Sequence, residues 1–206
     1  ESAMTIEDGR RILAGRAKAL SIVLLLFVAA DLALSVITAL GLLDRAATDP
    51  MAARIAIAAG LAQFGCLVAS AVTTSMWLYR ANDNLRQTGA TLTYGPNGAW
   101  AWYLVPVANL FKPFQAMQEI WDASLGASSE AASNGQALLR LWWGCWIGGN
   151  ILATLAQRLE DVNHAIAAVL GFGATASLAG SAWFLYRIVG EITEAQQARG
   201  EAAVFA

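Results

Sequence analysis

PVANLFKPFQAMQEIW, residues 106–121, decides how this chain folds, because it lies among four longer apolar runs and still carries a polar face of its own. Leu110, Phe114, Met117 and Trp121 recur at steps of four, three and four, which predicts a helix with one apolar stripe. We expect this helix to lie in the membrane interface with its apolar side down. Its opposite side carries polar groups that pure lipid would not accept, namely Lys112, Gln115, Gln118, Glu119 and Asp122.

Four apolar runs surround this segment, and each is long enough to cross a bilayer, which takes roughly 20 mostly apolar residues in a helix. The composition agrees, since 57% of the 206 residues are hydrophobic and only 14% are charged, against about a quarter in soluble domains. Mean hydropathy is +0.51. The sequence therefore predicts an all-α polytopic membrane protein, a single integral membrane domain over residues 1–206. The expected spans are residues 19–43, 55–79, 138–159 and 162–189.

The segment between the second and third spans, residues 99–124, allows two arrangements. Trp100, Trp102 and Tyr103 suit the headgroup level, where aromatic rings are enriched. Pro106 and Pro113 each remove a backbone donor and disfavour a helix just before them. An amphipathic helix at the interface and a partly re-entrant dip into the membrane both remain open.

Topology follows from the basic residues, which concentrate on the cytoplasmic side of spans. Four spans with the central segment at the surface leave three basic residues outside, at positions 45, 54 and 158. The other ten fall inside, whereas a fifth crossing would split the charges almost evenly. We therefore expect both termini in the cytoplasm. The ten inside are Arg10, Arg11, Arg16, Lys18, Arg80, Arg86, Lys112, Arg140, Arg187 and Arg199.

Several functions are disfavoured by what the sequence contains. A net charge of −2 and the absence of a basic block argue against nucleic acid as a partner. Cys66 and Cys145 sit in apolar runs, which favours buried free thiols. His164 is the only histidine and has no spaced companions, so we expect no metal site and no cofactor. No nucleophile motif occurs, so no catalytic residue is assigned. An enzymatic function is therefore the less favoured hypothesis.

One ionisable residue lies inside a span. Asp31 falls at the middle of the first run, where an acid costs a few kcal/mol and marks a functional-site hypothesis. We expect a ligand or ion site there, with Asn150, Gln63 and Ser70 as candidate partners. The alternative is an aspartate that joins helices by hydrogen bonds.

A second candidate site lies at the cytoplasmic surface. Arg80 and Asn84 follow the second span, and the polar face of the central segment would lie beside them. The group is expected to bind lipid headgroups or a partner protein, while the alternative is that Arg80 only anchors a span end. Asn109 stands between two prolines and could instead satisfy the turn. The full set is Arg80, Asn84, Asn109, Lys112, Gln115 and Glu119.

A combined pattern of residues lies between Trp77 and Ser124. Its members are Trp77-Leu78-Tyr79-Arg80, Asn84-Leu85, Gly89, Trp102, Pro106, Asn109, Pro113, Gln115 and Trp121. In this pattern the chain resembles a bacterial membrane-protein family, domain-of-unknown-function family 4328. The resemblance implies a small multi-span protein of the bacterial inner membrane with no assigned activity. Two departures are Phe114, where a tyrosine is usual, and the turn at residues 95–98, where a shorter one is usual.

Two functional hypotheses follow. In the first, the protein binds or transports a small ligand or ion through the polar site around Asp31, and a thin four-helix bundle would favour a homo-oligomer for conduction. In the second, it is a membrane scaffold that recruits a protein partner through its cytoplasmic amphipathic segment. Membrane lipids are expected partners in both.

Overall fold

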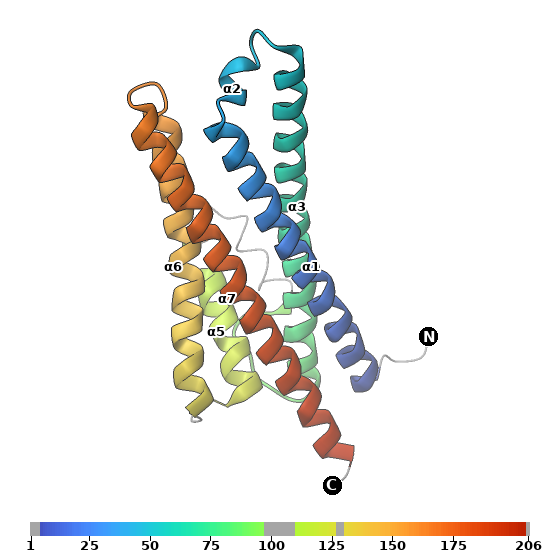
Figure 1. Ribbon diagram of the computed structural model, residues 1–206. Helices are drawn as coiled ribbons and strands as arrows, with labels where there is room; N and C mark the ends of the chain where they lie inside the picture. Colours follow the sequence, from blue (N-terminus) through green and yellow to red (C-terminus); the bar gives the residue numbers. More distant parts are fainter. Residues whose placement is uncertain (1–4, 97–109, 127–129, 205–206) are drawn as a thin grey trace. The chain divides into compact units, whose positions relative to one another are not determined.

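The computed structural model describes residues 5–96, 110–126 and 130–204. The secondary structure of these residues is helical, with no strand among them. The predicted all-α fold class is confirmed at this level. The elements in chain order are α1 (Ile6–Ala39), α2 (Leu42–Arg45), α3 (Pro50–Gln87), α5 (Lys112–Leu125), α6 (Glu130–Leu159) and α7 (His164–Val204) (Figure 1).

Three helices are long and apolar enough to cross a membrane: α1, α3 and the stretch His164–Arg199 of α7. Among the described residues, α6 is not one of these, although it contains the predicted span 138–159. The prediction of a membrane protein is therefore supported by three helices. The central segment is described only from Leu110 onward, so Trp100, Trp102, Tyr103, Pro106 and Asn109 lie outside the described residues.

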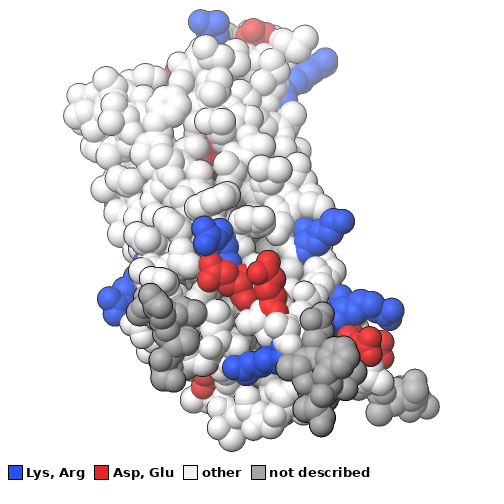
Figure 2. Space-filling model, turned by 60° about the horizontal axis from the view of Figure 1, so that its bottom comes forward, with Lys and Arg blue, Asp and Glu red and all other residues white. Residues whose placement is uncertain are grey.

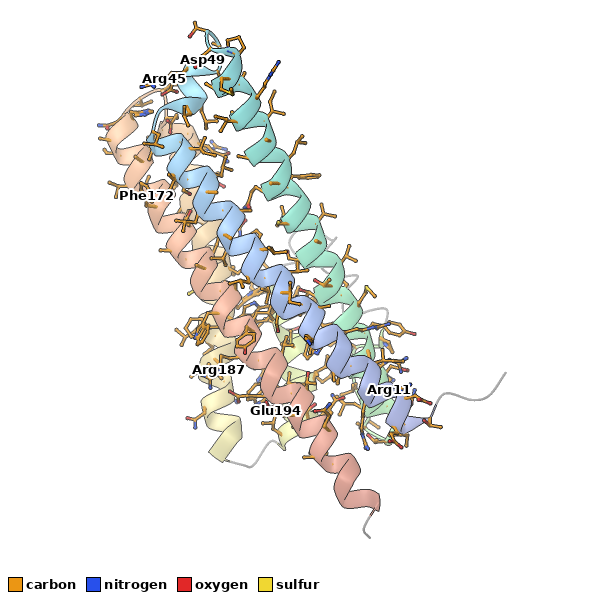
Figure 3. All side chains as sticks on the ribbon, turned by 45° about the vertical axis from the view of Figure 1, so that its right-hand side comes forward. Arg11, Arg45, Asp49, Phe172, Arg187 and Glu194 are labelled. Atoms are coloured by element: carbon orange, nitrogen blue, oxygen red, sulfur yellow. The ribbon has the colours of Figure 1, made fainter. Side chains whose placement is uncertain are left out.

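Local sequence signals explain where the first two long helices begin and end. Thr5 and Asp8 form a capping box: the Thr5 hydroxyl donates to Asp8 Oδ2 at 2.7 Å, and the Asp8 N–H donates to Thr5 Oγ1 at 3.1 Å. Gly41 takes the left-handed conformation, with φ of 66°, which favours glycine and ends a helix. α1 therefore ends at Ala39, four residues before the end of the predicted span 19–43. Asp49 accepts a bond from the Met51 N–H at 2.8 Å at the start of α3, in the turn where Figure 3 labels it with Arg45.

The chain divides into two compact units. The first comprises residues 1–21, 72–141 and 184–206, and the second comprises residues 22–71 and 142–183. The first unit buries large apolar side chains, for example Trp77, Met117 and Ile188, each 0% exposed. It therefore has a core of the kind that soluble domains have.

The second unit is packed differently. Many of its buried apolar residues are small, such as Ala167 and Ala174, whereas Leu25, Leu61 and Val169 are 72%, 68% and 72% exposed. Extended apolar surface of this kind marks contact with a membrane or another apolar partner. Small residues let helices approach closely: a Cβ on Gly149 would lie 2.8 Å from Leu178 Cγ.

Candidate functional site

Asp31 and Gln63 meet in the second unit, where α1 and α3 supply one residue each. The Gln63 side-chain N–H donates to Asp31 Oδ1 at 2.7 Å. The other two oxygens of the pair, Asp31 Oδ2 and Gln63 Oε1, are buried and have no hydrogen-bond partner among the described residues. An acceptor left buried without a donor costs free energy, so this pair is suited to a group that brings a proton or a positive charge.

The other two candidates for this site are engaged elsewhere. The Asn150 side chain is exposed, and its N–H donates to Trp146 O of the same helix at 2.7 Å. The Ser70 hydroxyl donates to Leu67 O, also in its own helix, at 2.8 Å. The structure thus joins Asp31 to Gln63 and shows Asn150 and Ser70 bonded to their own turns.

A second polar contact of the same unit was missed from the sequence. The hydroxyls of Ser35 and Thr175 lie 2.6 Å apart and join α1 to α7. Ser35 follows Asp31 by four residues, so both lie on one face of α1. The four-residue spacing between Asp31 and Ser35 is the sequence signal for this contact. A single serine in an apolar run does not by itself predict one.

The first unit contains a buried polar network centred on Asn84 and Gln196. The Asn84 side-chain N–H donates to Gly9 O at 3.2 Å. The Gln196 side-chain N–H donates to Ala81 O at 3.2 Å and to Ser124 Oγ at 3.1 Å. These bonds tie α1, α3, α5 and α7 together inside the unit. Buried polar groups require such partners, so the network also specifies how the helix ends pack.

Two members of the predicted cytoplasmic surface site are part of this interior. Arg80 is 6% exposed and Asn84 is 5% exposed. The Arg80 guanidinium pairs with the Asp83 carboxylate at 3.0 Å. The structure therefore corrects the expectation that both side chains lie on a surface, because helix ends pack over them.

The remaining described members lie around α5. The Lys112 ammonium donates to the Tyr94 hydroxyl at 3.1 Å, and that hydroxyl donates to Gln115 Oε1 at 2.8 Å. Glu119 accepts bonds from the backbone N–H groups of Thr93 and of Tyr94, the latter at 3.2 Å. These contacts fasten residues 93–94 to α5.

The apolar side of α5 differs in part from the predicted stripe. Met117 and Trp121 are fully buried, as a stripe requires, but Leu110 is 43% exposed. Within the first unit the buried face also includes Pro113, Ala116, Ile120 and Ser124. Protein therefore covers the apolar face that the sequence suggested would face the membrane.

A groove of about 440 Å³ lies between loop residues 91–94 and α5. Figure 2 shows acidic and basic side chains gathered close together on the face that it turns forward. Residues 91–94 form the outer wall of the groove. Asn82 and Arg86 of α3 hold this wall in place, because their side chains donate to the carbonyl of Tyr94 at 2.8 and 3.1 Å. The lining residues are Thr91, Leu92, Thr93, Tyr94, Gln115, Gln118, Glu119, Asp122 and Ala123.

The groove carboxylate of Asp122 has a raised pKa. Desolvation moves this pKa above the ordinary aspartate value. The folded state therefore holds this proton more tightly than the unfolded chain does. Its contribution to stability is greatest at low pH and declines as pH rises from the ordinary value through the raised one. We expect Asp122→Asn to raise the melting temperature slightly at pH 7 and not at pH 3, measured by thermal unfolding in detergent. An equal shift at both pH values would contradict this assignment.

Comparison with known proteins gives a family without an assigned activity. The family model described as a domain of unknown function, DUF4328, matches residues 41–194. Neither the search of curated proteins nor the search of solved structures gave a match. The match includes Gln63 and the whole groove, while Asp31 lies before it. It spans most of the chain and agrees with the resemblance seen between Trp77 and Ser124. The chain therefore belongs to the DUF4328 family.

Proposed function

We propose that this protein is a small integral protein of the bacterial inner membrane that binds, and moves, a proton or small cation at Asp31 and Gln63. The observation that carries the proposal is the pair of buried oxygens, Asp31 Oδ2 and Gln63 Oε1, that have no donor among the described residues. A proton on the carboxylate or a cation between the two oxygens would offset the cost of burying them.

The position of this pair along the helices supports the proposal. Residues 22–39 of α1 and 50–71 of α3 belong to the second unit, and at 1.5 Å per residue they measure about 27 and 33 Å. Both lengths are close to the thickness of a hydrocarbon core, about 30 Å. Asp31 and Gln63 fall near the middle of these segments, where an ionisable group is expensive and usually functional.

The proposed topology has four spans, with α6 as the additional one and both termini in the cytoplasm. Residues 142–159 of α6 supply an apolar segment of about 27 Å to the second unit. Ten of the thirteen basic residues belong to the first unit, and only Arg45, Arg54 and Arg158 belong to the second. The positive-inside rule then favours a cytoplasmic location for the ends of the chain.

The first test uses dicyclohexylcarbodiimide, which enters membranes and modifies protonated carboxyl groups. We expect Asp31 to be modified in protein reconstituted in liposomes, as read by peptide mass spectrometry. Protection by Na⁺ or K⁺ would identify a competing cation, and modification without protection would identify a proton site. The exposed Asp161 is the control carboxylate. An Asp31 that is never modified, in any salt, would exclude the proton form.

The second test measures transport. With a membrane potential imposed across liposomes, we expect Asp31→Asn to lower the proton or cation flux by about tenfold or more, a change of at least about 1.4 kcal/mol. Gln63→Leu should lower it as well, since it removes the partner oxygen, whereas Asp161→Asn should leave it unchanged. Circular dichroism and gel filtration establish that each variant is folded. Equal flux through wild type and Asp31→Asn would contradict the transport role.

A scaffold function is the second candidate, and the accessible polar side of α5 favours it. Lys112, Gln115 and Glu119 lie on the side of α5 that the unit leaves accessible, at exposed or half-buried positions. Charge reversal at Lys112 and Glu119 should abolish co-purification of a bound protein if the protein recruits a partner there. Unchanged co-purification would count against the scaffold role.

A further inference from the structure

The groove beside α5 is open to solvent and has a volume of about 440 Å³. Small-molecule sites occupy about 300–1,000 Å³. One wall is the loop of residues 91–94, and the other is the polar side of α5. The outer wall is held in place by α3, because the Arg86 guanidinium donates to Leu92 O at 2.6 Å and to Tyr94 O at 3.1 Å.

The backbone of the outer wall is already used. The N–H groups of Thr93 and Tyr94 donate to the Glu119 carboxylate, and the carbonyls of Leu92 and Tyr94 accept bonds from Arg86. A peptide that added itself as a strand would need these groups. The groove is therefore suited to a small ligand and not to an extended backbone.

The charged side chains of the groove indicate which class of ligand it would bind. Glu119 is compensated by two backbone N–H groups, but the Asp122 side chain, one turn further along α5, makes no hydrogen bond or ion pair with any described residue. Burial raises the pKa of Asp122 above the ordinary aspartate value. A positively charged group would offset that desolvation.

The basic residues around the groove have other partners. Lys112 lies over the Tyr94 ring, 5.3 Å from its centroid, and bonds the hydroxyl. Arg86 bonds Asn82 Oδ1 at 3.1 Å as well as the two carbonyls. Arg199 donates to Ala123 O at 2.8 Å. Lys112 therefore contacts Tyr94, Arg86 contacts the outer wall, and Arg199 contacts the α5 backbone.

We propose that the groove binds a small organic ammonium ion, with the Asp122 carboxylate as its counter-ion and the Gln118 amide oxygen as a further hydrogen-bond acceptor. The Tyr94 side chain would contact the methylene groups of the ligand. This site uses none of the residues of the Asp31–Gln63 pair and stands independently of it.

The test is isothermal titration of the full chain in phosphatidylcholine nanodiscs, which carry no net lipid charge. The probe is 1,4-diaminobutane, and 1,4-butanediol is the neutral molecule of similar shape. We expect saturable one-to-one binding of the diamine and none of the diol. Asp122→Asn should weaken binding by about tenfold or more, and Gln118→Leu should weaken it less. Glu194→Gln, on the exposed side of α7 (Figure 3), should bind like wild type.

Three results would overturn the proposal: no saturable binding of the diamine, equal binding of the diol, or unchanged affinity in folded Asp122→Asn. If Asp122→Asn does not fold, Gln118→Leu decides, and unchanged affinity there would likewise count against the site. Asp31→Asn should retain wild-type affinity for the diamine, so failure at the groove and failure of the transport role are distinguishable.

Discussion

Gly135→Ala is expected to destabilise the protein by about 2–3 kcal/mol, the usual cost of overpacking a well-packed core. A Cβ at this position would lie 2.0 Å from Trp121 Cε2 and 2.1 Å from Trp121 Nε1. Trp121 is fully buried, and its ring is rigid, so the whole side chain would have to move. Thermal unfolding in detergent should show a melting temperature lowered by about 5–10 °C.

Gly144→Ala is the matched control on the same helix. Among the described residues, no atom outside the helix's own backbone lies within 4 Å of a Cβ at this position. Alanine is also the better helix former by about 0.5–1 kcal/mol. The control should therefore melt at the wild-type temperature or slightly above it. If the two variants melted alike, the close packing of α6 on Trp121 would be refuted. Trp121→Leu should also lower the cost of Gly135→Ala, and a double-mutant cycle measures that coupling.

Asn82→Ala is expected to cost about 1–3 kcal/mol, because it removes two hydrogen bonds, each worth about 0.5–1.5 kcal/mol. Asn82 is 0% exposed. Its N–H donates to Tyr94 O at 2.8 Å, and its oxygen accepts a bond from Arg86 at 3.1 Å. Unfolding in detergent measures the loss of stability. Because the outer wall of the groove depends on these bonds, affinity for 1,4-diaminobutane should fall as well.

Two further substitutions separate the effect of Asn82 on the groove from its effect on stability. Asn82→Asp keeps an acceptor for Arg86 but loses the donor to Tyr94 O, so it should weaken the groove while retaining part of the stability. Gln87→Ala removes an exposed bond to Asp83 and should change stability by no more than about 0.5 kcal/mol. Stability that is unaltered in Asn82→Ala would show that the outer wall is held by other contacts.

The interior of the first unit shows why some site residues escaped prediction. Asn84 and Arg80 directly follow a long apolar run, and charged or amide side chains in that position usually face water. Their burial depends on Gly9 and Gln196, which come from helices about 75 and 110 residues away in sequence. Sequence periodicity reports which face of a helix is polar, but it does not report whether another helix covers that face.

Composition and residue pattern are sufficient to predict the helical class, the membrane character and the family. Apolar runs of sufficient length can satisfy their backbone groups in lipid only as helices, and the motif between Trp77 and Ser124 identifies the family without any tertiary contact. The sequence also singled out Asp31, because a carboxylate is conspicuous within an apolar run.

Which residues contact one another depends on how the helices pack. The tertiary structure paired Asp31 with Gln63 and not with Asn150, and it covered the apolar face of α5 with protein. It also formed the groove from residues 91–94, whose sequence carries no motif for binding. These outcomes depend on the rotation of each helix and on side-chain contacts between distant segments. Hydrophobic periodicity constrains the rotation of a helix only loosely, and long-range contacts leave no signal in a single sequence.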